Sequence, residues 1–315
     1  MTGDAPYHAA VAGDGPQPRT VWLRAADGVR LRAAHWPAAA KGTVFLFPGR
    51  TEYVEKYAPA AAELAVRGYG MVTVDWRGQG LSDRLHPDPM MGHVARFTDY
   101  QIDAAALEAL ARALDLPRPW HLLAHSMGAT IALRSLLGPH PFASVAVSAP
   151  MWGILFPPRL YPVALGVTAA AALTGQRRRR TPGTSPLAYP AYAPFEDNLL
   201  TTDRAMWDWM ARQVRDAPGL ALGGPSLGWL ATAMRECARL ARMPSPAIPC
   251  VCALGSRERI VATPPIRRRM AAWRGGRLDL YEGAEHEVMM EAPHHRARFY
   301  DAAAALFDAV RGRSA

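Results

Sequence analysis

The hydrophobic residues of this chain form short continuous runs that alternate with longer segments, in which apolar residues recur at roughly every third or fourth position. The short runs are typical of buried β-strands, and the longer pattern is typical of amphipathic helices. The predicted strands are residues 21–23, 31–36, 43–47, 70–75, 120–124, 142–148, 248–254 and 277–281. Strands that alternate with helices indicate a mainly parallel sheet with helices on both faces. We therefore predict an α/β fold built on an eight-stranded sheet.

Between these strands the pattern predicts helices over residues 54–67 and from Ile102 to Leu114, and a closing helix from Phe299 to Val310. The pair Asp27-Gly28 separates the first two strands and predicts a hairpin turn there.

The pattern changes at residues 151–242, where prolines cluster and tryptophans then appear in helical segments. We interpret this segment as a mobile, mostly helical cap, inserted into a core of residues 19–150 and 243–312. An aromatic-rich cap suits an acyl chain, because pockets for such ligands are lined mainly by apolar side chains. Tryptophans at this spacing are also common in ordinary cores. Residues 1–18 are rich in glycine and proline, so we expect a flexible tail, and they show no secretory signal.

The most informative motif reads Ala-His-Ser-Met-Gly at residues 124–128, where a predicted strand meets a predicted helix. A serine on such a junction presents its hydroxyl above the sheet, and small neighbours such as Ala124 and Gly128 permit the sharp turn. Ser126 is therefore a candidate nucleophile. The alternative is that Ser126 only caps the helix, as serine often does.

Two later residues supply the rest of a catalytic triad. Serine is a weak nucleophile until an imidazole accepts its proton, and the imidazole needs a carboxylate that fixes its tautomer. Glu258 and His286 each follow the end of a later predicted strand, in the order acid then histidine. We assign His286 as general base and acid, and Glu258 as the orienting carboxylate. Asp279 and Glu282 are alternatives for the acid, and an exposed ion pair is the alternative role for Glu258.

Ester cleavage also requires two N–H groups aimed at the oxyanion. We assign the backbone N–H of Met127, which follows the nucleophile, and that of Arg50, in the loop after the predicted strand 43–47. Gly49 in the same loop would let the backbone approach the substrate closely.

With these residues in place, the chain resembles the α/β-hydrolase superfamily, and within it the bacterial lysophospholipase and monoacylglycerol-lipase-like group. The resemblance is carried by FPGRTEYVEKY (47–57), DWRGQGLSD (75–83), AHSMG (124–128), GSRERIV (255–261) and EHEVMME (285–291). Pro48-Gly49, where monoacylglycerol lipases usually have His-Gly, makes the first block more similar to the lysophospholipases. Two residues depart from the common pattern: Ala124 replaces a glycine, and Glu258 replaces an aspartate.

The resemblance implies a serine ester hydrolase that cleaves a single-chain lipid ester, above all a lysophospholipid, through an acyl-enzyme and without a cofactor. A monoacylglycerol lipase, a general carboxylesterase and an acyltransferase are alternatives within the same class. A non-catalytic member that binds lipid or protein is the alternative from another class, and it would be favoured if Glu258 and His286 were unable to meet.

Charge and cysteine content add expectations about partners and location. The net charge is +9 over 315 residues, but the basic residues are scattered and form no nucleic-acid-binding module. Residues 160–174 are uncharged, and this run is too short to span a membrane. Four arginines, Arg177–Arg180, follow shortly after it. This pair of features predicts peripheral contact of the cap with an anionic membrane surface, and the alternative is an ordinary packed helix. Three cysteines, with no metal-ligand spacing nearby, indicate a reducing, cytoplasmic compartment and no metal site.

Overall fold

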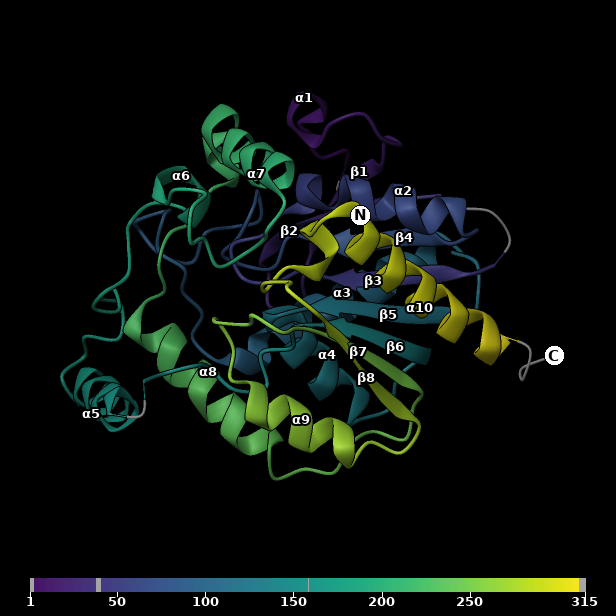
Figure 1. Cartoon of the computed structure of the whole chain (residues 1–315). Coiled ribbons are helices and arrows are strands. Elements are labelled where there is room, and N and C mark those ends of the chain that lie inside the picture. Colours follow the sequence, from purple (N-terminus) through teal and green to yellow (C-terminus); the bar gives the residue numbers. More distant parts are fainter. Residues whose placement is uncertain (1–2, 38–40, 158, 312–315) are drawn as a thin grey trace.

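The computed structural model describes residues 3–37, 41–157 and 159–311. Its centre is an eight-stranded sheet with the order β1-β2-β4-β3-β5-β6-β7-β8 (Figure 1). The strands are β1 (Arg19–Arg24), β2 (Arg30–Trp36), β3 (Thr43–Phe47), β4 (Gly70–Val74), β5 (Trp120–His125), β6 (Phe142–Ser148), β7 (Cys250–Gly255) and β8 (Gly276–Tyr281). β2 is antiparallel to β1 and β4, and all other neighbours are parallel. The predicted mainly parallel sheet is confirmed.

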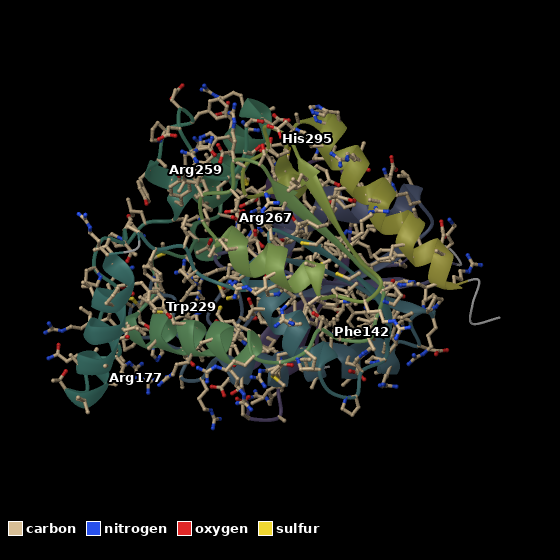
Figure 2. The ribbon with its side chains drawn as sticks, turned by 60° about the horizontal axis from the view of Figure 1, so that its bottom comes forward. Phe142, Arg177, Trp229, Arg259, Arg267 and His295 are labelled. Carbon is tan, nitrogen blue, oxygen red and sulfur yellow. The ribbon has the colours of Figure 1, made fainter. Side chains whose placement is uncertain are left out.

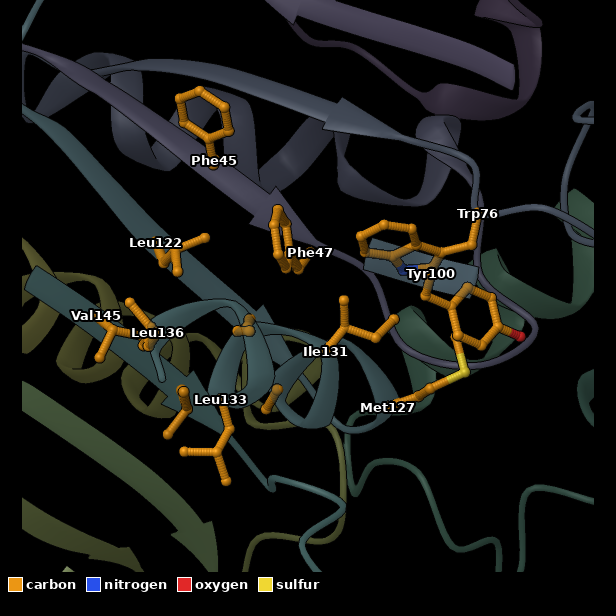
Figure 3. Close-up of a cluster of buried hydrophobic side chains, with 14 of the residues drawn as sticks. Phe45, Phe47, Trp76, Tyr100, Leu122, Met127, Ile131, Leu133, Leu136 and Val145 are labelled. Carbon is orange, nitrogen blue, oxygen red and sulfur yellow. The ribbon is translucent and has the colours of Figure 1, made fainter. Parts of the chain in front are cut away.

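Helices cover both faces of the sheet (Figure 1). α2 (Ala58–Val66) and α10 (Pro293–Arg311) pack on one face, and α3 (Tyr100–Ala113), α4 (Met127–Leu136) and α9 (Thr263–Ala271) pack on the other. In β3, Phe45 and Phe47 point to the α4 side, where Figure 3 shows them in one apolar cluster, while Val44 and Leu46 point to the α10 side. A strand buried on both faces requires such a continuous apolar run.

The helix predicted over residues 54–67 is divided in two. A 3-10 turn, η1 (Val54–Tyr57), precedes α2, and Pro59 lies in the first turn of α2. Proline has no N–H and fits the first helical turn but not a helix interior, so a new helix begins at this point.

The N-terminal segment is not the free tail that the sequence suggested. The Ala5 N–H donates to the Thr20 carbonyl at 3.1 Å, and α1 (Ala9–Ala12) follows shortly after. The His8 N–H donates to a Glu55 carboxylate oxygen at 3.0 Å, and Gln213 Nε2 donates to the Val11 carbonyl at 2.9 Å. The backbone N–H and C=O groups of this segment thus form hydrogen bonds with residues distant in sequence, although its Gly- and Pro-rich composition favours no regular structure.

Between β6 and β7 the chain leaves the sheet, and we call residues 151–242 the insertion. It contains α5 (Leu160–Leu173), α6 (Tyr189–Tyr192), α7 (Arg204–Asp216) and α8 (Leu227–Leu240). Figure 1 shows these helices grouped to one side of the strands. None of the helices in the described ranges has the length and hydrophobicity that crossing a membrane requires.

Candidate active site

Ser126 lies in the turn between β5 and α4, as the sequence pattern predicts. Its φ of 49° and ψ of −116° are rarely adopted by residues other than glycine. The turn is tight because α4 starts against β3, where a Cβ atom on Gly128 would lie 2.1 Å from the Phe47 carbonyl oxygen. The Ser126 N–H donates to the Ser148 carbonyl at 3.0 Å and fixes the turn to β6. The strained backbone therefore holds the Ser126 hydroxyl at the end of the parallel strands.

The three residues assigned from the sequence lie in contact. His286 Nε2 is 3.0 Å from Ser126 Oγ, and His286 Nδ1 is 2.7 Å from Glu258 Oε2. An ionised carboxylate has no proton to donate, so Nδ1 carries the hydrogen and Nε2 is left to accept the serine proton. This is the geometry in which an imidazole activates a serine.

Glu258 is held in place from both sides. One carboxylate oxygen faces His286, and the other accepts the N–H groups of Ile260 at 2.7 Å and Val261 at 3.0 Å. Burial by itself raises the pKa of Glu258, but His286 and the two N–H groups lower it below its usual value. Glu258 is therefore ionised at neutral pH.

The other candidates for the acid have different partners. Asp279 accepts from Arg277 at 2.9 Å, and Glu282 accepts from the Ser256 hydroxyl at 3.1 Å. The exposed ion pair considered for Glu258 is absent among the described residues, since the neighbouring Arg259 pairs with Asp197 and Glu285 instead.

The electrostatics of His286 suit a general base. Its burial lowers the pKa of the imidazole, because a charged ring loses hydration. The Glu258 carboxylate, with smaller contributions from Glu287 and Glu52, stabilises the charged ring, and together they hold the pKa of His286 above its usual value. An imidazole of this kind accepts a proton readily from a serine that attacks a carbonyl.

The two backbone donors assigned to the oxyanion hole follow the ends of two neighbouring strands. β3 and β5 are parallel with Phe47 opposite Ala124, and Arg50 and Met127 follow this pair at the same spacing. Met127 is the first residue of α4, where the helix leaves N–H groups without an intrahelical partner. Figure 3 shows its side chain extending toward Tyr100 within the buried cluster, which anchors the backbone at this point.

The structure gives a second explanation for glycine at position 49, besides the predicted close approach of the backbone to the substrate. A Cβ atom there would lie 2.8 Å from Glu52 Oε2 and 3.0 Å from His125 Cδ2. The Gly49 N–H also donates to Glu52. A side chain at this position would therefore displace Glu52 from its present place.

A buried ionic cluster beneath the site was missed by the sequence analysis. Lys56 Nζ lies 2.8 Å from Glu52 and 2.5 Å from Glu287, and the Tyr57 hydroxyl donates to Glu52. Burial alone raises the pKa of Glu52, but Lys56 and the neighbouring His125 lower it. The only sequence signal was a Glu and a Lys four positions apart, which is typical of exposed helix surfaces.

Glu52, His125 and Glu287 have the spacing of a metal-binding group. The Lys56 ammonium, however, contacts both of these carboxylates. The chain itself therefore supplies the cation that the two carboxylates face.

A cavity of about 570 Å³ opens onto Ser126 and His286. Every helix of the insertion from α5 to α8 contributes to its wall. Its apolar lining includes Met151, Ile154, Phe156, Leu160, Leu199, Leu200, Met210, Val214, Trp229 and Leu230. A cavity of this size and character accommodates a single acyl chain.

Comparison with known proteins finds similarity over most of the chain. A family model described as serine aminopeptidase, S33, matches residues 38–293. Lysophospholipase L2 of Escherichia coli K12 is 34% identical over 276 residues, which are 84% of this chain and 78% of that protein. A probable lysophospholipase L2 of Haemophilus influenzae is 31% identical over 284 residues, 88% of each chain.

Solved structures share the fold at lower identity. A soluble variant of monoglyceride lipase from Saccharomyces cerevisiae, in complex with a substrate analog, superposes with a TM-score of 0.73 at 19% identity, over 97% of this chain and 99% of that one. The monoacylglycerol lipase of Paleococcus ferrophilus gives a TM-score of 0.67 at 19% identity, over 89% and 99% of the two chains.

Proposed function

We propose that this chain, which belongs to the α/β-hydrolase family and is a serine ester hydrolase, releases the fatty acid from a lysophospholipid. The observation that carries the proposal is the contact chain from Ser126 through His286 to Glu258, which opens onto an apolar cavity. The lipid class is supported by the lysophospholipase L2 relatives, which align with most of the chain.

In the proposed reaction Ser126 Oγ attacks the ester carbonyl carbon while His286 Nε2 takes the serine proton. The N–H groups of Met127 and Arg50 stabilise the oxyanion. The ester C–O bond then breaks, His286 returns the proton to the departing alcohol, and the fatty acyl group stays on Ser126. Water attacks this acyl-enzyme, gives a proton to His286 and releases the fatty acid, after which the proton returns to Ser126.

Peptide cleavage at a free amino terminus, which the family description names, is less well supported by the cavity. Binding an α-ammonium group requires an available carboxylate. Glu52 and Glu287 line the cavity, but both are engaged by Lys56. Because Lys56 already occupies both carboxylates, an α-ammonium group would find no free partner here. The cavity therefore favours an uncharged acyl chain.

A panel of single-chain substrates tests the proposal. We expect purified protein to hydrolyse lysophosphatidylcholine and lysophosphatidylethanolamine with a higher kcat/KM than a monoacylglycerol of the same chain length, as measured by fatty acid release. Preference for the monoacylglycerol, or for a short p-nitrophenyl ester, would retain the serine mechanism and reject the proposed substrate. No turnover by folded protein would favour the binding-only alternative.

We also propose that the insertion acts as a cap whose outer helix, α5, rests on an anionic membrane surface. α5 exposes apolar side chains on several sides: Leu160 at 50%, Val163 at 54%, Leu165 at 46% and Leu173 at 89%. Arginines follow directly, and Figure 2 shows Arg177 at the edge of the molecule. An exposed apolar helix beside basic residues is typical of interfacial binding.

Sedimentation with vesicles measures this contact. We expect the double change Val163→Asp and Leu173→Asp to weaken binding to phosphatidylglycerol vesicles by on the order of tenfold or more, because apolar burial is lost and like charges repel. Val66→Asp is the matched control, since Val66 is 80% exposed at the end of α2, outside the insertion. Equal binding by both variants, each shown to be folded by circular dichroism, would contradict the proposed contact.

A further inference from the structure

The Arg50 side chain lies in the wall of the cavity without an acidic partner among the described residues. Its Nη2 donates to the Gly223 carbonyl at 2.5 Å, and its Cζ lies 5.2 Å from the centre of the Trp229 ring. Its Nε is buried and has no hydrogen-bond partner within the described part of the chain. Figure 2 shows Trp229 inside the outline of the molecule, at the start of α8.

Two buried arginines of this protein are neutralised by carboxylates, while a third, Arg269, donates to the backbone carbonyls of Leu240 and Met243. Arg32 pairs with Glu55 and Asp75 at 2.7 Å each, and Arg77 pairs with Asp103 at 2.7 Å. Arg50 lines the cavity and has no acidic partner among the described residues, and burial together with the positive charge of Arg180 lowers its pKa to about 10. A buried cation without a counter-ion is costly, and proteins usually pair such a group. Arg50, unlike Arg269, keeps an Nε without a hydrogen-bond partner among the described residues and lies in the cavity wall, which favours pairing with an anion that enters the cavity.

A second donor lies on the same wall. Thr181 Oγ1 is buried and has no hydrogen-bond partner in the described ranges. The Thr181 N–H donates to the Pro225 carbonyl at 2.9 Å, while Arg50 binds the carbonyl of Gly223 in the same short segment. Both residues line the cavity that reaches Ser126. The guanidinium and the hydroxyl thus offer unused donors from neighbouring positions.

We propose that Arg50 and Thr181 form an anion subsite that binds the phosphate of the lysophospholipid head group. This inference rests on the proposed function and deepens it. In a lysophospholipid the phosphate is one glycerol backbone away from the scissile ester. The Arg50 guanidinium is one side-chain length away from its own N–H, which is assigned to the oxyanion of that ester. The planar guanidinium fork also matches the oxygens of a phosphate.

The charge distribution in the cavity supports separate sites for the acyl chain and for the anionic head group. Its other lining cation, Lys56, is already bound by Glu52 and Glu287. The acyl chain would occupy the apolar lining, and Arg50 would select an anionic head group over the neutral glycerol of a monoacylglycerol.

Inhibition by two compounds with the same tail tests the subsite without relying on turnover. Dodecyl phosphate and dodecanol compete with a short p-nitrophenyl ester, and their inhibition constants are compared. We expect wild type to prefer dodecyl phosphate, and Arg50→Gln to lose on the order of tenfold to a hundredfold of that preference, since a charge-assisted hydrogen bond is removed while the backbone N–H remains. Arg50→Lys, which keeps the charge, should restore part of the preference.

Matched threonine variants separate the second donor from general packing. Thr181→Val should lower the preference severalfold. Thr184→Val is the control: Thr184 also lines the cavity, but its hydroxyl already donates to the Thr181 carbonyl at 2.7 Å, so the preference should persist.

Equal inhibition of wild type by the two compounds, or an unchanged preference in Arg50→Gln, would overturn the subsite. Inhibition by inorganic phosphate at the concentration at which dodecyl phosphate acts would assign the site to a free anion and overturn its role in substrate binding. The substrate panel decides the proposed function separately. A protein that prefers monoacylglycerol but binds dodecyl phosphate through Arg50 would refute the substrate and support the subsite.

Discussion

Ser126→Ala is expected to lower kcat for lysophospholipid hydrolysis by on the order of a millionfold. Alanine removes the only atom that forms the acyl-enzyme in the proposed reaction, and it leaves His286 without the hydroxyl that it contacts at 3.0 Å. Fatty acid release by wild type and variant, at saturating substrate, measures the loss. Covalent labelling by a fluorophosphonate should disappear in parallel, because the reagent requires an activated serine.

Ser135→Ala is the matched control for this change. Ser135 lies on the same helix, α4, and its hydroxyl donates to Gln101 at 2.8 Å, away from His286. We expect this variant to be labelled by the fluorophosphonate and to hydrolyse substrate within a few-fold of wild type. Retained turnover by Ser126→Ala would show that the mechanism proposed here is wrong. Failure to label folded wild type would support a member that binds lipid without cleaving it.

The positions of Ser126 and His286 were predictable because Ser126 follows the buried strand β5, and His286 follows β8, in which apolar and charged residues alternate. Carboxyl ends of parallel strands meet at one edge of a sheet, so chain order and strand ends together bring such residues close. For Glu258 the pattern left Asp279 and Glu282 open. The choice depended on a 2.7 Å contact that only side-chain packing defines.

Other features depended on burial, which local sequence does not reveal. Glu52 and Lys56 have the spacing of an exposed helical ion pair, but the insertion and the strand ends enclose them. The environment of the Arg50 guanidinium was equally hidden, because the sequence does not show that no acidic residue of the described part of the chain pairs with it. The N-terminal segment had no periodicity, yet its backbone found partners in β1, η1 and α7.

Glu258→Gln is expected to lower kcat on the order of ten-thousandfold, since an amide no longer holds the imidazole in the required tautomer or stabilises its charge. The pH profile gives a second readout. Catalysis needs neutral His286, so kcat/KM rises with pH through the pKa of this group. In wild type that pKa lies above its usual value of about 6.5, because Glu258 favours the charged ring. Without the carboxylate, burial dominates, and the midpoint should move to lower pH.

Asp279→Asn separates this role of Glu258 from a general effect of removing negative charge near the site. Asp279 lies on β8 and is bound to Arg277, so we expect nearly wild-type kcat and an unchanged pH midpoint. A loss in Asp279→Asn as large as that in Glu258→Gln would mean that the acid is shared or misassigned. A loss in Glu258→Gln with no change in the pH midpoint would indicate that Glu258 supports the loop through Ile260 and Val261 rather than tuning His286.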